Sequence, residues 1–421
     1  MKVSKRDFLK AGALGAGALV LAPEFGISPL MAQAKDSPPP IFDPLPPISK
    51  EERQERVAKA QQLMRQAGVG ALLLEPGSSM LYFTGISWWR SERLTAVVIP
   101  AQGEIAVVTP YFEEPSVRES LAFGDDVRSW NENENPLVLV NGILADRGAL
   151  DRPLALEETV RYFVISELKL VNPHIEVVSG SPITQGCRMY KSAHELQLMR
   201  RASDITVAAY RNTHAKIAAG MTPEDISSLM AAAMTGFGGS AEFQLILLGE
   251  ASAYPHGSSQ PQAVREGEIV LMDCGCSYQG YQSDISRTFV HGEPSKKHRQ
   301  VWETVRRGQQ LGYETAQLGT PAGKVDDTVR AWYESLGYGP GYQTPGTPHR
   351  LGHGIGMDGH ERVNFVGGET TALQPGMCFS NEPGIYIYGE FGVRLEDCLY
   401  MTESGPKWFS VPPPSIDQPF A

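Results

Sequence analysis

The chain has 421 residues, of which 42% are hydrophobic and 20% charged, the composition of an ordinary globular protein. Its formal net charge of -11 argues against nucleic acid or an anionic membrane surface as a partner, because both bind basic patches. A chain of this length is expected to fold as two domains rather than one.

Residues 1–34 have the three parts of an export signal. A basic start precedes an apolar run over residues 11–22, and Ala32-Gln33-Ala34 supplies the small residues of a cleavage site. The run is too short and too rich in glycine for a membrane-spanning helix. The stretch SKRDFLK, residues 4–10, resembles the twin-arginine export motif, with Lys5 in place of the first arginine. We therefore expect export to the periplasm, with the twin-arginine pathway as a candidate route.

Residues 35–48 are rich in proline and predict an extended tether. An α/β domain is expected over residues 49–186, opening with a helix that starts after Ser49 and ends at Gly68. Short apolar runs in this region predict strands. They are ALLLEP, LTAVVIP, EIAVVTP, LALEE and IEVVSG.

A second domain is expected over residues 187–421. A long amphipathic helix is predicted to end at Gly220, and Thr222 and Pro223 then begin another helix as its cap and first residue. Further segments read as strands at 241–249, 268–275 and 281–290, as helices at about 295–318 and 322–336, and as strands and turns thereafter. Helices combined with antiparallel strands indicate the α+β class.

Two aspartates, Asp273 and Asp284, occur in the apolar, strand-like segment VLMDCGCSYQGYQSDISRTF. Burying an ionised carboxylate costs many kcal/mol unless a cation or hydrogen bonds compensate it. Cys274 and Cys276 share the strand face opposite Asp273. Because the five cysteines are odd in number and not spaced as a disulfide scaffold, we expect buried free thiols.

Three later segments carry side chains of the same kind. HRLGHGIG contributes His349 and His353, and FSNEPGIY contributes Glu382 beside a turn. GVRLEDCLY contributes Glu396, predicted inside a strand with Arg394 on the same face. With the two aspartates, this gives four carboxylates in apolar or glycine-lined surroundings.

Two divalent cations would balance four carboxylates. Ligands that are mostly hard oxygen with one nitrogen favour Mn²⁺, Fe²⁺, Co²⁺ or Zn²⁺ over copper. A pair of such ions generates a nucleophilic hydroxide from water at neutral pH. The pattern therefore predicts a dimetal centre.

The order and type of these residues resemble the five metal ligands of the metallopeptidase family that includes methionine aminopeptidase, aminopeptidase P and prolidase. The matching residues are Asp273, Asp284, His353 in GHGIG, Glu382 in EPG and Glu396 in RLED. The resemblance implies a pita-bread catalytic domain over residues 187–421, preceded by a smaller creatinase-like α/β domain over residues 49–186.

The resemblance also implies roles. Asp273 would chelate one metal, Asp284 and Glu396 would bridge both, and His353 and Glu382 would complete the second. Two Mn²⁺ ions are the expected cofactors, with Co²⁺, Fe²⁺ or Zn²⁺ as alternatives. Glu382 would also act as general base and then acid for a hydroxide that bridges the metals.

Further positions match by the same resemblance. His256 would hold the substrate backbone, and His360 would stabilise the oxyanion. His349 matches a third histidine of the aminopeptidase P branch. Arg394 would orient a ligand carboxylate by charge-assisted hydrogen bonds.

The implied activity is hydrolysis of the peptide bond before proline, by an Xaa-Pro aminopeptidase or an Xaa-Pro dipeptidase. The implied partners are a proline-containing peptide and further copies of the chain, as a homodimer or a higher homo-oligomer. Two alternatives stay open. One is a small-molecule C–N hydrolase or C–S lyase on the same fold, and the other is a non-catalytic binding module.

Overall fold

The structure is a computed structural model that describes residues 42–420. The predicted export signal and the first part of the predicted tether lie outside the described residues. The described part of the tether has no helix or strand, and its backbone forms hydrogen bonds with the second region. Leu45 donates its N–H to the Tyr278 hydroxyl at 3.1 Å, and its carbonyl accepts from Gln279 at 2.9 Å.

The first folded region is a mixed six-stranded sheet with the order β4-β3-β2-β1-β5-β6. All five predicted apolar runs form strands, whereas β4 was missed because its sequence VRSW has no such run. The strands are β1 Ala71–Leu74, β2 Ala96–Pro100, β3 Ala106–Pro110, β4 Val127–Trp130, β5 Leu154–Leu156 and β6 Val177–Ser179. The helices are α2 Lys50–Ala67, α3 Ser78–Thr84, α4 Glu114–Ser120, α5 Pro136–Asp146, α6 Tyr162–Val171 and α7 Ser181–Arg188.

The ends of α2 follow from its sequence, as predicted. The Ser49 side chain accepts a hydrogen bond from the Glu52 N–H at 3.1 Å, which caps the first turn. Gly68 ends the helix in the left-handed conformation, at φ 71°. One face of the helix, including Ala60 and Met64, is buried.

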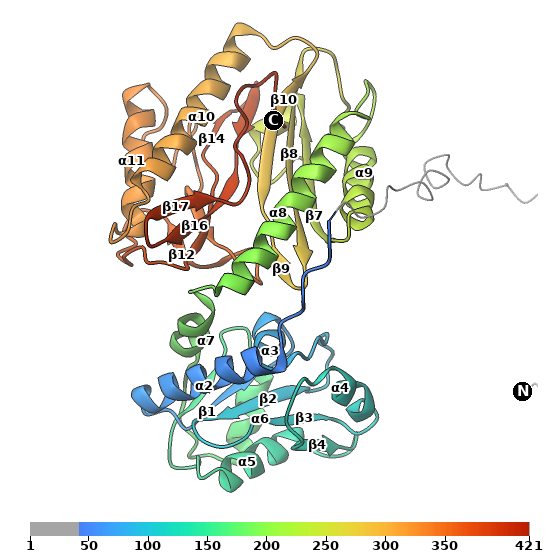
Figure 1. Ribbon diagram of the computed structural model, residues 1–421, viewed down its shortest axis with the longest axis vertical. Coiled ribbons are helices and arrows are strands. Elements are labelled where there is room, and N and C mark those ends of the chain that lie inside the picture. The colour runs from blue at the N-terminus through green and yellow to red at the C-terminus, as the bar shows by residue number, and fades with distance from the viewer. Residues whose placement is uncertain (1–41, 421) are drawn as a thin grey trace, which may run out of the picture. The chain divides into compact units, whose positions relative to one another are not determined.

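The second region has two helix pairs with strands between them, and Figure 1 shows α8 and α9 on one side and α10 and α11 on the other. One sheet has the order β10-β8-β7, with β9 beside β8, another has β12-β11-β13-β16-β17, and β14 pairs with β15. The helices are α8 Ala193–His214, α9 Pro223–Gly236, α10 Lys296–Thr315 and α11 Ala322–Ser335. The strands are β7 Ser240–Leu248, β8 Glu268–Tyr278, β9 Tyr281–Gln282, β10 Ile285–His291, β11 Gly352–Gly354, β12 Glu361–Phe365, β13 Cys378–Asn381, β14 Gly384–Ile387, β15 Phe391–Arg394, β16 Asp397–Thr402 and β17 Gly405–Trp408.

The predicted end of α8 was wrong by six residues. The helix stops at His214, and the chain then turns so that Gly220 donates its N–H to the Val264 carbonyl at 2.8 Å. This contact with another segment outweighs continuation of the helix. The next helix is as predicted, with Thr222 as its cap and Pro223 as its first residue.

Both faces of strand β8 are buried, and Asp273 lies on the face opposite Met272 and Cys274. Met272, Cys274 and Cys276 pack in one buried cluster with residues of α8 and α9, and side-chain alternation puts Asp273 on the other face. All five cysteines are buried and free, as predicted. Among the helices of residues 42–420, none is long and apolar enough to cross a membrane.

Candidate metal centre

Two of the four predicted ligand carboxylates come from the sheet that contains β8. Asp273 lies on β8, opposite Ser286 of β10 and Leu245 of β7. Asp284 lies in the short break between β9 and β10, just before Ile285 starts β10. Both aspartates line one cavity of about 660 Å³.

The other two carboxylates lie where a strand pair changes sheets. Asn381 pairs with Asp397 in the large sheet, and Gly384 pairs with Arg394 in the two-stranded sheet. Glu382 and Glu396 occupy the two breaks between these pairings. The prediction that Glu396 lies inside a strand was therefore wrong. Its N–H leaves the hairpin ladder and donates to the Ser286 carbonyl at 3.1 Å.

His353 is fixed in its ring orientation by its own strand, β11. Its Nδ1 lies 3.1 Å from the Gly354 carbonyl, which favours a proton on that nitrogen. Nε2 then faces the carboxylates, at 3.6 Å from Asp284 and 3.5 Å from Glu382. The glycine before it is required, because a Cβ at Gly352 would lie 2.1 Å from the Ser380 carbonyl oxygen.

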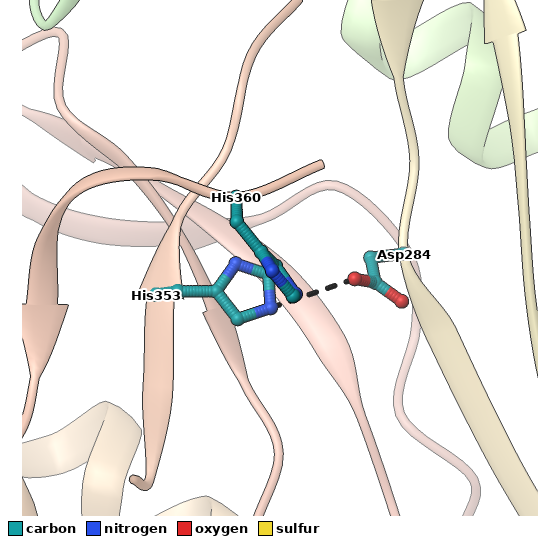
Figure 2. Close-up of side chains that lie close together, drawn as sticks. All are labelled: Asp284, His353 and His360. Atoms are coloured by element: carbon teal, nitrogen blue, oxygen red, sulfur yellow. Dashed lines mark ion pairs between the residues drawn. The ribbon is translucent and has the colours of Figure 1, made fainter. Parts of the chain in front are cut away.

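These side chains form overlapping groups whose ligand atoms lie within 4.8 Å of one another. The groups are Asp273 with Asp284 and Glu396, His353 with Glu382 and Glu396, and Asp284 with His353 and His360. Figure 2 shows the last group, with Asp284 and the two imidazoles converging and the ion pair between Asp284 and His353 dashed. The rings of the two histidines have centroids 4.1 Å apart.

Three carboxylate oxygens in this cluster are buried without a hydrogen-bond partner among residues 42–420: Asp273 Oδ1, Asp284 Oδ1 and Glu396 Oε1. An unpartnered buried carboxylate oxygen carries a large desolvation cost. A cation is the partner that satisfies all three together. The donor set, oxygen with one imidazole nitrogen, fits two divalent cations such as Mn²⁺.

The electrostatics of the cluster point the same way. Burial raises the pKa of Asp284 and of Glu396 well above the ordinary range, and neighbouring carboxylates add to the effect. Burial, with a contribution from Asp273, also raises the pKa of Glu382 to about 7, although Arg394 opposes it. Burial lowers the pKa of His353 well below its usual value. The imidazole is therefore neutral and free to act as a ligand.

Arg394 binds one carboxylate oxygen of Asp273. Its guanidinium is 3% exposed and donates to Asp273 Oδ2 at 2.6 Å, Ser286 Oγ at 2.9 Å and the hydroxyl of Tyr386 at 3.1 Å. One Asp273 oxygen is thus fixed by arginine, and the unpartnered one is left for a metal. The predicted role of Arg394 agrees with this geometry.

Replacing Arg394 by methionine is expected to destabilise the fold by about 3–5 kcal/mol, because it leaves a buried carboxylate unpaired. Metal affinity is expected to fall about 10–100-fold. Urea unfolding of the metal-free protein and calorimetric metal titration measure the two effects. Arg394→Lys keeps the positive charge but lacks the several N–H donors of a guanidinium. Its stability and metal affinity should lie between those of Arg394→Met and wild type. Unchanged metal affinity in Arg394→Met would contradict the role.

All nine residues singled out from sequence line the 660 Å³ cavity. Besides the ligands and Arg394, His256 lies on the loop after η2 (Gly249–Ala253) and is exposed, as is His360. His349 Nε2 lies 3.0 Å from the Tyr386 hydroxyl, and its Nδ1 is 3.8 Å from Glu382. The pKa of His349 is lowered to about 3, chiefly by burial, so this ring is neutral.

Sequence reasoning missed Arg350. It lines the 660 Å³ cavity and also, with His360, a neighbouring cavity of about 210 Å³. Among residues 42–420 its guanidinium forms no ion pair and no hydrogen bond, whereas Arg394 and Arg188 are both paired with carboxylates. The position of Arg350 next to His349 was the only indication in the sequence that it belongs to the site. A sequence does not reveal which arginine side chain has no carboxylate partner.

Comparison with known proteins agrees with the fold. The model of metallopeptidase family M24 matches residues 197–403, and the creatinase/prolidase N-terminal domain matches residues 56–190. A probable dipeptidase PepE of Mycobacterium tuberculosis is 33% identical over 359 residues, which cover 83% of this chain and 92% of that protein. An Xaa-Pro dipeptidase of Lactobacillus helveticus is 30% identical, over 84% of this chain and 95% of that protein.

Among solved structures, the crystal structure of dipeptidase PepE from Mycobacterium ulcerans matches with a TM-score of 0.80 and 30% identity. The match covers 87% of this chain and 98% of that one. The predicted α+β class, pita-bread catalytic domain and creatinase-like first domain are therefore confirmed. With its fold and its cluster of carboxylates and imidazole both in place, this chain belongs to metallopeptidase family M24, a family of dimetal hydrolases.

Proposed function

We propose that this enzyme hydrolyses Xaa-Pro dipeptides at the peptide bond before proline. The observation that carries the proposal is the set of three unpartnered carboxylate oxygens beside a neutral imidazole in one cavity. The relatives named dipeptidase and Xaa-Pro dipeptidase support the substrate class. A complete ligand set also argues against a non-catalytic binding module.

Asp273, Asp284, His353, Glu382 and Glu396 would hold the two cations, because their ligand atoms fall into overlapping groups within 4.8 Å. When bound, the pair of cations would activate a water molecule and polarise the substrate carbonyl. Manganese is the proposed metal, because hard oxygen donors dominate the set. Metal analysis of the purified protein tests this choice against cobalt, iron and zinc.

Glu382 is placed to move the proton that the reaction must transfer. Hydrolysis breaks a C–N bond, adds a hydroxyl group to the acyl carbon and needs a proton on the leaving proline nitrogen. That nitrogen carries no hydrogen before cleavage. The Glu382 carboxylate, in the same cavity as the other proposed ligands, can accept a proton from water and return it to that nitrogen.

Two histidines would contact the substrate. His360 lies within 4.8 Å of ligand atoms of Asp284 and His353, close to where an oxyanion would develop, so it would donate a hydrogen bond there. His256 lines the same cavity on the loop after η2 and would hold the substrate backbone.

Arg350 favours the dipeptidase over the aminopeptidase. An unpaired guanidinium in the site is complementary to a free carboxylate, which the leaving proline of an Xaa-Pro dipeptide carries. A longer peptide has an uncharged amide at that place. Wild-type protein is therefore expected to prefer Gly-Pro over Gly-Pro amide.

Arg350→Met is expected to lower kcat/KM for Gly-Pro about 10–100-fold, mostly through KM, because one charge-assisted contact is lost. The amide substrate should change less than about 3-fold. Steady-state kinetics with both substrates measures the difference. Equal losses on the acid and the amide would contradict carboxylate binding, and faster cleavage of Gly-Pro-Gly-Gly than of Gly-Pro by wild type would indicate an aminopeptidase P.

Two further proposals concern the whole protein in the cell. We propose export to the periplasm by residues 1–34, supported by the basic start, the apolar run and the small residues at 32–34. We also propose a homodimer or higher homo-oligomer. Cell fractionation with and without residues 1–34 tests the first proposal, and light scattering of the purified protein tests the second.

A further inference from the structure

His360 lies on a turn, residues 356–361, that Glu361 organises from within. Glu361 Oε1 accepts from the backbone N–H groups of Met357 at 3.1 Å and Asp358 at 3.3 Å. Gln282 adds a hydrogen bond to the Met357 carbonyl at 3.0 Å. The ring of His360 is exposed and forms no hydrogen bond among residues 42–420. Apart from the contact with the ring of His353, its direction therefore depends on the shape of this turn.

The same carboxylate is held from outside by residues at the junction of the two regions. Arg188, the last residue of α7, lies 2.5 Å from Glu361 Oε1, and Lys191 lies 2.8 Å from Oε2. Arg188 also binds Asp358 at 2.7 Å. The second Asp358 oxygen accepts from Ser78, at the start of α3, at 2.5 Å. We refer to Arg188, Lys191, Asp358 and Glu361 as the Glu361 cluster.

The Glu361 cluster is mostly buried and closely fitted. The side chain of Glu361 is 8% exposed and that of Lys191 is 3% exposed. Burial alone would raise the pKa of Glu361, but Lys191 and Arg188 lower it to about 2, so the carboxylate is ionised. A Cβ at Gly356 would lie 2.7 Å from the Glu361 carboxylate. Buried ion pairs are weak evidence for net stability, and in some proteins they instead fix one arrangement of the chain.

We infer that the Glu361 cluster is a positioning device that directs His360 toward the metal centre. Arg188 and Lys191 lie between β6, the last strand of the first region, and α8, the first helix of the second region. The junction between the two regions would therefore help to set the catalytic geometry. None of the four side chains needs to touch the substrate. They act through the backbone of the turn and are positioning residues.

A double-mutant cycle tests the inference, and its kinetic readout rests on the proposed function. Glu361→Gln is expected to lower kcat for Gly-Pro about 10–100-fold, with KM within about 3-fold and both metals retained. His360→Ala alone should lower kcat about 100–1,000-fold with the metals retained. In the His360→Ala background, Glu361→Gln should change kcat less than about 2-fold, because no imidazole remains to be displaced. Additive losses would overturn the inference.

Two further variants separate positioning from folding. Asp358 is half exposed, so Asp358→Asn should fold normally and still show a smaller kcat loss that disappears in the His360→Ala background. Glu75→Gln is the matched control, because Glu75 is also buried and pairs with Arg161 at 2.7 Å within the first region. Its kcat should stay within about 2-fold of wild type. A loss in the control equal to that of Glu361→Gln would overturn the inference.

Hydrogen exchange gives a readout that needs no turnover. The amides of Met357 and Asp358 should exchange faster in Glu361→Gln and in Arg188→Met than in wild type, since their acceptor is no longer held. If the amides of residues 356–361 exchange equally slowly in these variants and in wild type, the inference is overturned. This result does not depend on which substrate the enzyme cleaves. Failure of wild-type protein to cleave any Xaa-Pro peptide counts against the proposed function alone.

Discussion

Glu382→Ala is expected to lower kcat by at least about 1,000-fold and to weaken binding of one metal. The substitution removes the carboxylate proposed to move the proton, a role worth about 10²–10⁴ in rate. It also removes a proposed metal ligand, whose Oε1 lies 3.5 Å from His353 Nε2. Steady-state kinetics on Gly-Pro and metal analysis after dialysis measure the two losses. Normal turnover by Glu382→Ala would contradict the proposed role of Glu382 in proton transfer.

Glu382→Gln is the control that separates the two roles of this residue. Glutamine keeps the shape and one oxygen donor but cannot take a proton at neutral pH. The expected result is near-wild-type metal content with a kcat loss close to that of Glu382→Ala. A glutamine variant that binds two metals and turns over normally would assign the proton transfer to another group.

The sequence predicted the residues of the site better than their local structure. Residue types in order were enough to pick out Asp273, Asp284, His353, Glu382 and Glu396, and all five line one cavity. The predicted position of Glu396 inside a strand was wrong because the sequence GVRLEDCLY has the pattern of one uninterrupted strand. The break at Leu395 and Glu396 arises from a change of partner, from β14 to β13, which is a tertiary event.

Helix starts were predicted more reliably than one helix end. Ser49 and Thr222 cap their helices through local hydrogen bonds that a short sequence window contains. The end of α8 at His214 depends instead on Gly220 bonding to Val264, forty-four positions later in the chain. The ion pairs between Arg188 and the turn that bears His360 are equally non-local, and no spacing rule in the sequence indicates them.

Removing the metals is expected to abolish activity and to change how stability depends on pH. Without cations, the folded protein keeps Glu382 at a pKa of about 7, against an ordinary value of 4.5, because of burial. Between these two values the folded state binds a proton that the unfolded chain has released. Glu382 therefore contributes stability to the metal-free protein that is lost as pH rises from about 4.5 to about 7. Asp284 and Glu396 have raised pKa values and contribute in the same sense. The lowered pKa values of His349 and His353 act in the opposite sense up to about pH 6.5, so the contribution of Glu382 is measured as the difference between wild type and Glu382→Gln.

Bound metals should remove this dependence, because cations take the place of the protons and bind only the folded state. The difference in Tm between the manganese-loaded and the chelator-treated protein is expected to widen by several degrees from pH 5 to pH 7.5. Calorimetry across this range measures it. Relative to metal-free Glu382→Gln, which lacks one titrating carboxyl, the metal-free wild type should lose stability as pH rises from 5 to 7. A stability difference that stays constant, or that grows in favour of wild type, would mean that Glu382 is ionised without cations. Its raised pKa would then no longer support a dimetal centre.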